Sequence, residues 1–319
     1  MVAELITNIW IAMIALVAGF VFLIKGADFF VDGASSVAGK LKVPSMIIGL
    51  TIVAMGTSLP ECAVSVTASM IGNNALAVSN AVGSNIFNLM VVCGMCALFT
   101  PLAVQMGTLK KEFPFSIICA GLLIGLGFAG MSLGHLDGVA MLVLFAVYLV
   151  RMIISATKAR KAAADEEAPD TLPVWKCVLF IVGGAVAIKY GGDFVVDGAS
   201  FIAAKVGMSQ NLIGLTIVAL GTSLPELVTS IVAAKKNEVD MAIGNVVGSN
   251  IFNILLVLGV SAAISPVAFV MENLIDIAIL IVMSIVVWVF AYTNQQIRRR
   301  EGVIMLLMYV AYLVYICIR

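Results

Sequence analysis

Charge is the scarcest property of this sequence, because only 11% of its 319 residues are charged while 62% are hydrophobic. The mean hydropathy of +1.14 lies far above that of water-soluble domains. Several apolar runs reach the roughly 20 residues that cross a bilayer as a helix, and the short alternating segments of a β-barrel do not occur. The sequence therefore predicts an all-α polytopic membrane protein. It predicts neither an enzyme nor a nucleic-acid-binding protein.

The sequence also gives little support for a disulfide framework, a soft-metal site or a cleavable leader. The only histidine, His135, sits in the polar turn GHLDG, and the six cysteines all fall in apolar stretches. A disulfide framework needs exposed loops in an oxidising compartment, so we interpret the cysteines as small core residues. The first residues carry Glu4, no basic residue and no cleavage site, which argues against a removable signal peptide.

The apolar runs predict ten transmembrane helices. They cover residues 8–27, 43–70, 75–100, 114–131, 137–155, 174–192, 208–234, 240–264, 271–291 and 303–317. The one clearly polar stretch is 158–173, KARKAAADEEAPDTLP, whose alanines, mixed charges and prolines indicate a solvated linker. It divides the chain into a first unit, 1–157, and a second unit, 174–319, of five helices each.

The two units repeat each other. GLTIVAMGTSLPE at Gly49–Glu61 returns as GLTIVALGTSLPE at Gly214–Glu226, and GSNIFN at Gly83–Asn88 returns unchanged at Gly248–Asn253. A third pair, DFFVDGAS from Asp28 and DFVVDGAS from Asp193, keeps the same spacing. One constant offset across three blocks indicates that the chain is a duplication of a single five-helix unit.

An odd number of helices in each unit has a geometric consequence. The second unit must begin on the opposite side of the membrane, so we predict two inverted five-helix repeats about an axis in the membrane plane. Most of the 18 lysine and arginine residues then fall in cytoplasmic loops if the N-terminus is outside. The positive-inside rule therefore predicts that both termini are outside.

Each copy of the longest repeat places an acid next to a proline within an apolar helix. Pro60 and Pro225 lack a backbone N–H and interrupt the helix, and the carbonyls that they free near Ala54 and Ala219 need partners at that depth. Glu61 and Glu226 are costly in a membrane unless they are functional.

Further oxygen-bearing side chains surround the acids. Thr57 lies four residues before Glu61, and thus on one helical face with it, and Ser58 lies beside it. The second half repeats this set, and the GSNIFN helices add more oxygens in the same periodicity: Thr222, Ser223, Ser84, Asn88, Ser249 and Asn253. An all-oxygen set favours hard cations, and Mg²⁺ fits less well because it holds its water reluctantly. Ca²⁺ and Na⁺ fit best, and their similar radii would let them compete for one site.

Two other polar groups have simpler interpretations. Asp28 and Asp32, with their copies Asp193 and Asp197, lie four residues apart beside glycine at predicted span ends. We expect them to cap helices or lie at the interface, and a role in ion entry is the alternative. Asn85 and Asn250 lie about 100° from the face that carries Ser84 and Asn88, so we expect them to contribute to packing or capping.

At the GTSLPE and GSNIFN motifs the sequence resembles the sodium/calcium exchanger branch of the cation/calcium antiporter superfamily. The resemblance covers essentially the whole chain. It implies ion ligands from the listed side chains and from the carbonyls of Ala54 and Ala219. It also implies a third Na⁺, and hence electrogenic exchange.

The sequence departs from parts of that family. Potassium-dependent members carry an aspartate where this chain has Asn253, proton-coupled members carry an acidic motif where this chain has GSNIFN, and animal exchangers insert a large regulatory domain. The chain therefore resembles a compact prokaryotic inner-membrane member.

We expect a Ca²⁺/Na⁺ antiporter that works by alternating access. A Ca²⁺/H⁺ antiporter and a cation channel remain alternatives. We expect no cofactor, since Ca²⁺ and Na⁺ are the transported ions, and no partner beyond the lipid bilayer: neither nucleic acid nor an obligate protein.

Overall fold

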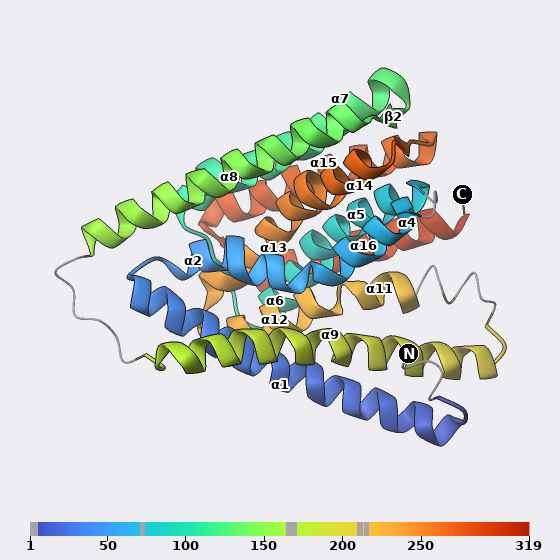
Figure 1. Cartoon of the computed structure of the whole chain (residues 1–319), viewed down its shortest axis with the longest axis horizontal. Coiled ribbons are helices and arrows are strands. Elements are labelled where there is room, and N and C mark those ends of the chain that lie inside the picture. Colours follow the sequence, from blue (N-terminus) through green and yellow to red (C-terminus); the bar gives the residue numbers. More distant parts are fainter. Residues whose placement is uncertain (1–5, 71–73, 164–170, 209–212, 214–216, 319) are drawn as a thin grey trace.

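The computed structural model describes residues 6–70, 74–163, 171–208, 213 and 217–318, and these are almost entirely helical (Figure 1). The first half contains α1 (Ile9–Leu41), α2 (Ser45–Ile48), the π-helical turn η2 (Gly49–Val53), α3 (Ala54–Thr57), α4 (Leu59–Met70), α5 (Asn74–Phe87), η3 (Asn88–Val92), α6 (Cys93–Phe99), β1 (Leu102–Ala103), η4 (Thr108–Glu112), α7 (Phe113–Gly130), β2 (Ser132–Leu133) and α8 (His135–Ala162). The second half contains α9 (Val174–Lys205), α11 (Ala219–Thr222), α12 (Leu224–Lys235), α13 (Val239–Phe252), η6 (Asn253–Leu258), α14 (Gly259–Ile264), β3 (Val267–Ala268), α15 (Met271–Asn294), β4 (Gln296–Ile297) and α16 (Arg299–Ile318).

Among the described residues, eight helices are long and apolar enough to cross a membrane, and one bent pair adds a ninth candidate span. That pair, α2–α3 with α4, matches the prediction at 43–70. The corresponding prediction at 208–234 lies partly outside the described residues, although α11 and α12 occupy its later part. The chain is an integral membrane protein, and its count of ten inverted spans stays a prediction.

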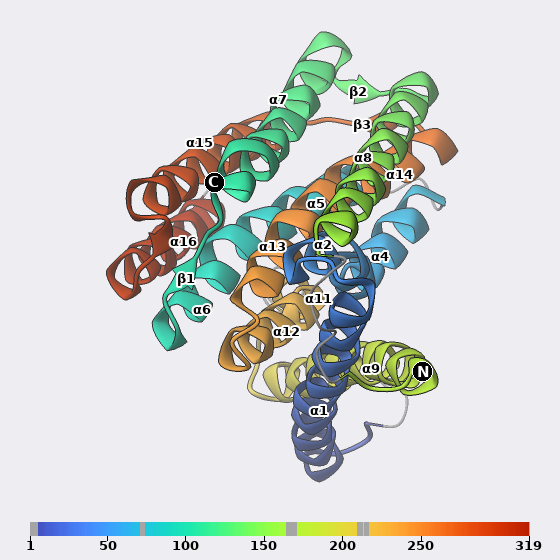
Figure 2. The same ribbon diagram turned by 90° about the vertical axis from the view of Figure 1, so that its left-hand side faces the viewer.

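The longest helices, α1 and α9, extend well beyond the predicted spans 8–27 and 174–192. They run side by side along one side of the molecule, whereas α7 and α8 lie on the opposite side (Figures 1 and 2). Close packing of α1 on α9 depends on glycine, because a Cβ added to Gly26 would lie 3.0 Å from the Gly184 carbonyl oxygen and one on Gly184 would lie 2.7 Å from that of Gly26. Small residues of this kind let membrane helices approach closely.

The aspartates expected at span ends lie inside these longer helices. Asp28 and Asp32 belong to the middle of α1, whose N-terminus is capped by Asn8 instead, and Asp193 and Asp197 lie within α9. The prediction that they cap helices is therefore wrong, and the alternative that they lie at the membrane interface stays a prediction. Four-residue spacing placed each pair on one helical face without revealing that the helix continues past it.

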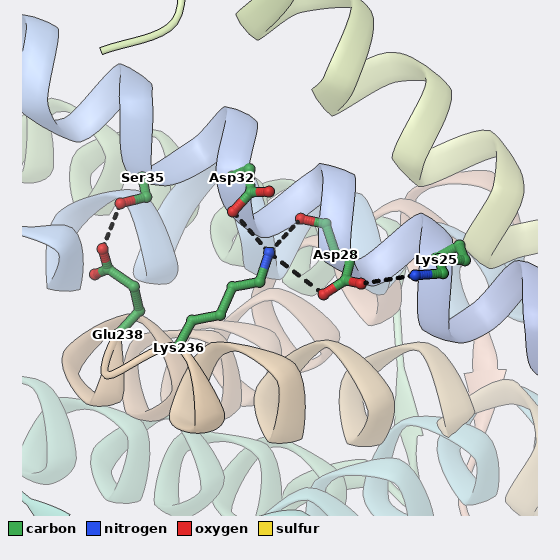
Figure 3. A network of polar contacts seen from close by, with 6 residues as sticks. All are labelled: Lys25, Asp28, Asp32, Ser35, Lys236 and Glu238. Carbon is green, nitrogen blue, oxygen red and sulfur yellow. Dashed lines mark hydrogen bonds and ion pairs between the residues drawn. The ribbon is translucent and has the colours of Figure 1, made fainter. Parts of the chain in front are cut away.

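Lys236, just after α12, ties that helix to α1 (Figure 3). Its ammonium nitrogen lies 2.7 Å from Oδ1 of Asp32, 3.3 Å from Oδ1 of Asp28 and 3.1 Å from the carbonyl oxygen of Asp28. The hydroxyl of Ser35, about one turn after Asp32 on α1, also donates to Glu238, the residue that precedes α13. We call this set of contacts the α1–α12 clasp.

The halves are also joined by two short antiparallel ribbons. β1 pairs with β4 and β2 pairs with β3, so that Leu102 lies opposite Ile297 and Leu133 lies opposite Val267. Each ribbon takes one strand from each half. In both views α4, α5, α12 and α13 occupy the region between the α1–α9 pair and the α7–α8 side (Figures 1 and 2).

The predicted linker 158–173 begins later than its composition suggested. α8 continues through Ala162, so that 158–162 are helical, while residues 164–170 lie outside the described residues. Alanine, lysine and arginine have high helix propensity, which lets the polar end of this helix continue out of the apolar span. His135, which the sequence placed in a polar turn, is exposed and is the first residue of α8.

Candidate functional site

The two acid-bearing helices are broken at the repeated serine. In the first half α3 ends at Thr57, α4 begins at Leu59, and the two segments meet at an angle of 49°. Ser58 between them has φ −85° and ψ 10°, and Ser223 in the second half has φ −94° and ψ 6°. Pro60 and Pro225 lie in the first turn of the new helix, where a missing N–H costs least. The predicted interruption by proline is confirmed.

The carbonyl of Ala54 is not the one that proline frees. It accepts the N–H of Ser58 at 3.1 Å and lies 3.4 Å from the hydroxyl oxygen of Thr57. The carbonyl that loses its helical donor is that of Gly56, four residues before Pro60. In the second half the N–H of Ser223 bonds to the carbonyl of Leu220 at 3.2 Å, one residue after Ala219. The two halves therefore differ in which carbonyl accepts the N–H of the serine: that of Ala54 in the first half and that of Leu220 in the second.

Glu61 and Glu226 are both completely buried. The hydroxyl of Ser58 donates to Oε1 of Glu226 at 2.8 Å, and that of Ser223 lies 3.1 Å from Oε1 of Glu61. Each serine thus contacts the acid of the other half. The helical-face argument placed Ser58 beside Glu61 in sequence but could not reveal this contact with the other half, because the helix bends at Ser58.

Thr57 also contacts a residue of the other half. Its hydroxyl oxygen lies 3.0 Å from Oδ1 of Asn245 on α13, as well as 3.2 Å from the carbonyl of Val53. Asn245 in turn donates to Ser230 at 2.9 Å and points its amide toward the carbonyl of Glu226 at 3.5 Å. Its copy Asn80 reaches Ser65 at 3.0 Å and the carbonyl of Glu61 at 3.3 Å. These two amides attach each acid-bearing helix to its neighbour in the same half.

The GSNIFN helices α5 and α13 meet through their asparagines. Asn85 and Asn250 each donate to the other's backbone carbonyl, at 3.1 and 3.2 Å. Asn88 donates to Oδ1 of Asn250 at 3.2 Å, and Asn253 donates to Oδ1 of Asn85 at 3.1 Å. Asn85 and Asn250 therefore do contribute to packing, and they also fix the amides of the two candidate ligands. Their unbroken repetition with GSNIFN was the available signal for that second role.

Several of the candidate ligands carry a buried oxygen without a hydrogen-bond partner. Among the described residues these oxygens include Oε2 of Glu61, Oε2 of Glu226, Oδ1 of Asn88 and Oδ1 of Asn253. All four atoms only accept hydrogen bonds in these forms, and a buried acceptor without a partner costs about 1–3 kcal/mol. A desolvated cation satisfies such atoms, and oxygen ligands select hard cations. Among the described residues, no group of three or more histidine, cysteine and acidic side chains is placed so that it could hold a metal ion.

The remaining predicted ligands lie on the same segments. Ser84 lies 3.1 Å from the Ser223 hydroxyl, and Ser249 is buried one turn before Asn253. Thr222 ends α11 and is half-buried, and Ala219 is the first residue of that helix. Asn88 is the first residue of the π-helical turn η3, and Asn253 is the first residue of η6. Such turns are often found at functional sites.

Sequence and structure comparisons agree on the class of protein. The family described as "Sodium/calcium exchanger protein" matches residues 11–154 and 176–318. The sodium/calcium exchanger MaX1 of Methanosarcina acetivorans is 32% identical, with 96% of this chain and 98% of that protein covered. The putative antiporter CaxA of Alkalimonas amylolytica is 46% identical, with 80% and 82% covered.

A solved structure of the sodium–calcium exchanger NCX_Mj, soaked with Na⁺ and Sr²⁺, superposes with a TM-score of 0.84. It is 30% identical, and the match covers 96% of this chain and 99% of that one. The fold and the paired buried acids thus define a membrane transporter, a cation/Ca²⁺ exchanger rather than an enzyme. This chain belongs to the sodium/calcium exchanger family.

Proposed function

We propose that this protein exchanges Ca²⁺ for Na⁺ across the membrane by alternating access. The observation that carries the proposal is the arrangement of Glu61 and Glu226. Both carboxylates are fully buried, each has one oxygen held by a serine of the opposite half, and each leaves its second oxygen without a partner. MaX1 and NCX_Mj are described as sodium/calcium exchangers, which supports Na⁺ as the counter-ion.

In this proposal the ion ligands are the residues expected from the sequence. Glu61 and Glu226 supply the charge. Hydroxyl, amide and carbonyl oxygens complete the coordination, from Thr57, Ser58, Thr222, Ser223, Ser84, Asn88, Ser249, Asn253, Ala54 and Ala219. Ca²⁺ takes six to eight oxygens, so two carboxylates supply only part of its shell. The unpartnered amide oxygens of Asn88 and Asn253 are the best placed of the neutral groups.

The charges of the two acids explain why the fluxes are coupled. One Ca²⁺, or two Na⁺, neutralises both carboxylates, whereas an ion-free site would carry two like charges through a medium of low dielectric constant. That cost suppresses transit without an ion. A third Na⁺ leaves one net positive charge to move, so exchange of three Na⁺ for one Ca²⁺ is electrogenic.

Alternating access requires one part of the protein to move against another. We assign the motion to α1 and α9, which hold none of the proposed ligands and pack on each other through glycine. The α1–α12 clasp must then open during each cycle, because it joins a moving helix to a helix that carries a ligand. We also propose that both termini lie outside a prokaryotic inner membrane and that a single chain suffices.

Purified protein in sealed vesicles tests the proposal. Vesicles loaded with Na⁺ should take up labelled Ca²⁺, and uptake should carry charge, so that an imposed membrane potential changes its rate. Uptake without any counter-ion gradient would indicate a channel. Uptake driven by a pH gradient with Na⁺ absent would indicate the Ca²⁺/H⁺ antiporter instead, a chemistry that two buried carboxylates also permit.

A further inference from the structure

A second polar site lies at the end of the molecule where α7 begins and α8 ends. It is a cavity of about 570 Å³ whose lining includes Lys110, Lys111, Glu112, Arg151 and Lys158. Four basic groups and one acid give the lining an excess of three positive charges. None of the three lysines forms an ion pair within the described part of the chain. The ion ligands of the exchange site do not line this cavity.

Arg151 is fixed from two directions. Its guanidinium group donates to Oε1 of Glu112, a buried carboxylate, and its Cζ lies 5.6 Å from the centre of the Phe115 ring. Phe115 is itself stacked on Tyr148, with ring centres 5.5 Å apart and planes at 8°. The Arg151 side chain nevertheless stays 41% exposed. A guanidinium group has five N–H donors in a planar fork, so donors remain for an anion in the cavity.

The same cavity continues onto the lipid-facing surface. Ile118 of α7 and Ile154 of α8 also line it and are 63% and 50% exposed. Val150 and Val147 extend this exposed apolar surface along α8. α8 has 28 residues and is therefore about 42 Å long, more than the roughly 30 Å of bilayer hydrocarbon. We therefore expect its polar last turns, with Lys158, to reach the level of the lipid headgroups.

We propose that this cavity binds the headgroup of an anionic phospholipid whose acyl chains lie along the exposed apolar surface of α7 and α8. The phosphate is recognised by Arg151, and the three lysines supply the attraction for its charge. Basic pockets between transmembrane helices at the cytoplasmic side bind anionic lipid headgroups in this way. A water-soluble phosphate would use the basic groups but not Ile118 and Ile154.

Delipidated full-length protein in neutral detergent provides the test. Native mass spectrometry would count retained lipids while phosphatidylglycerol or phosphatidylcholine is titrated. The triple variant Lys110→Gln, Lys111→Gln, Lys158→Gln removes the lysines and keeps the ion pair between Arg151 and Glu112. Arg151→Gln is not used, because it would leave the buried Glu112 carboxylate without its partner. Its matched control is Arg298→Gln, Arg299→Gln, Arg300→Gln. That control removes three exposed charges near β4, whose partner strand β1 leads into α7, so the two sets lie at one end of the molecule.

We expect phosphatidylglycerol to bind more tightly than phosphatidylcholine. The lysine triple should weaken its binding about a hundredfold, since each lysine near a lipid surface contributes about a fivefold factor. The arginine triple should leave this affinity unchanged. Equal losses in both triples, or no preference for the anionic lipid, would overturn the proposal. Displacement of the lipid by glycerol phosphate at similar concentration would identify a site for soluble anions and overturn it too. Binding is the only readout, so the result is independent of which ions are exchanged.

Discussion

Ser58 donates a hydrogen bond of 2.8 Å to Oε1 of Glu226, a residue of the other half of the chain. Ser223 stands in the corresponding position 3.1 Å from Glu61. Each half therefore supplies the serine that contacts the glutamate of the other half rather than its own. The exchange site exists only where the two halves meet, which explains why neither repeat carries a full set of ligands on one surface.

Replacing either acid should eliminate exchange while keeping the fold. Glu61→Gln and Glu226→Gln each remove one of two charges that face a divalent ion, and loss of one partner from a buried charge pair costs about 3–5 kcal/mol. We expect Ca²⁺ uptake by vesicles to fall at least about a hundredfold. Without ions, the melting temperature should stay equal or rise, because a desolvated carboxylate is gone.

Glu272→Gln is the matched control, since that acid is exposed in the first turn of α15. It should exchange as the unmodified protein does. Addition of Ca²⁺ should raise the melting temperature of the control but not of the two site variants. A site variant that transports normally would refute the assignment of its acid.

The two serines should be equivalent in effect. Ser58→Ala and Ser223→Ala each remove a hydrogen bond to a charged group, worth about 1.5–3 kcal/mol. We therefore expect the apparent Ca²⁺ affinity in flux assays to fall about tenfold to a hundredfold in both. Ser132→Ala, at an exposed serine, should have no effect. Strongly unequal losses would mean that the crossed contacts of the two halves do not have the same role.

We expect Asn85 to affect both stability and Ca²⁺ binding although it does not contact an ion itself. Asn85→Ala removes the acceptor for the amide of Asn253 and the donor to the carbonyl of Asn250. The amide of Asn253 then lacks its acceptor, at about 1–3 kcal/mol, whereas the carbonyl of Asn250 still accepts the backbone N–H of Asn253. We expect a lower melting temperature together with weaker Ca²⁺ binding, measured by calorimetry. Asn294→Ala, at an exposed position, is the control. A loss of stability with unchanged Ca²⁺ affinity would limit Asn85 to packing.

Opening the α1–α12 clasp should change the rate of exchange more than the stability. The acids that face Lys236 are partly exposed, and such ion pairs contribute only about 0–1 kcal/mol to stability. If the clasp must open in each cycle, Lys236→Met should raise the maximal exchange rate several-fold. The neighbouring Lys235, which lies over the Phe99 ring at 4.5 Å, offers Lys235→Met as the control. Equal rates in both variants would argue against motion at α1.

Much of the site was predictable from residue type and repetition. An acid beside a proline in an apolar segment is costly, so its repetition at Glu61 and Glu226 indicated function and a broken helix without any coordinates. Periodicity predicted less well where helices bend or extend. It did not reveal that Ser58 bonds to the acid of the other half, because the helix breaks at that residue, and it ended α1 early because Asp28 and Asp32 are charged.

The sequence alone determined that this is a helical membrane protein, that its halves are copies, and that its buried polar groups are oxygens suited to hard cations. Hydropathy, identity between repeats and ligand chemistry are all local properties of the chain. Only the tertiary structure decided that Ser58 serves Glu226, that Asn85 and Asn250 orient Asn253 and Asn88, and that Lys236 reaches α1. These contacts join residues separated by 160 or more positions, and their geometry depends on how the two halves pack.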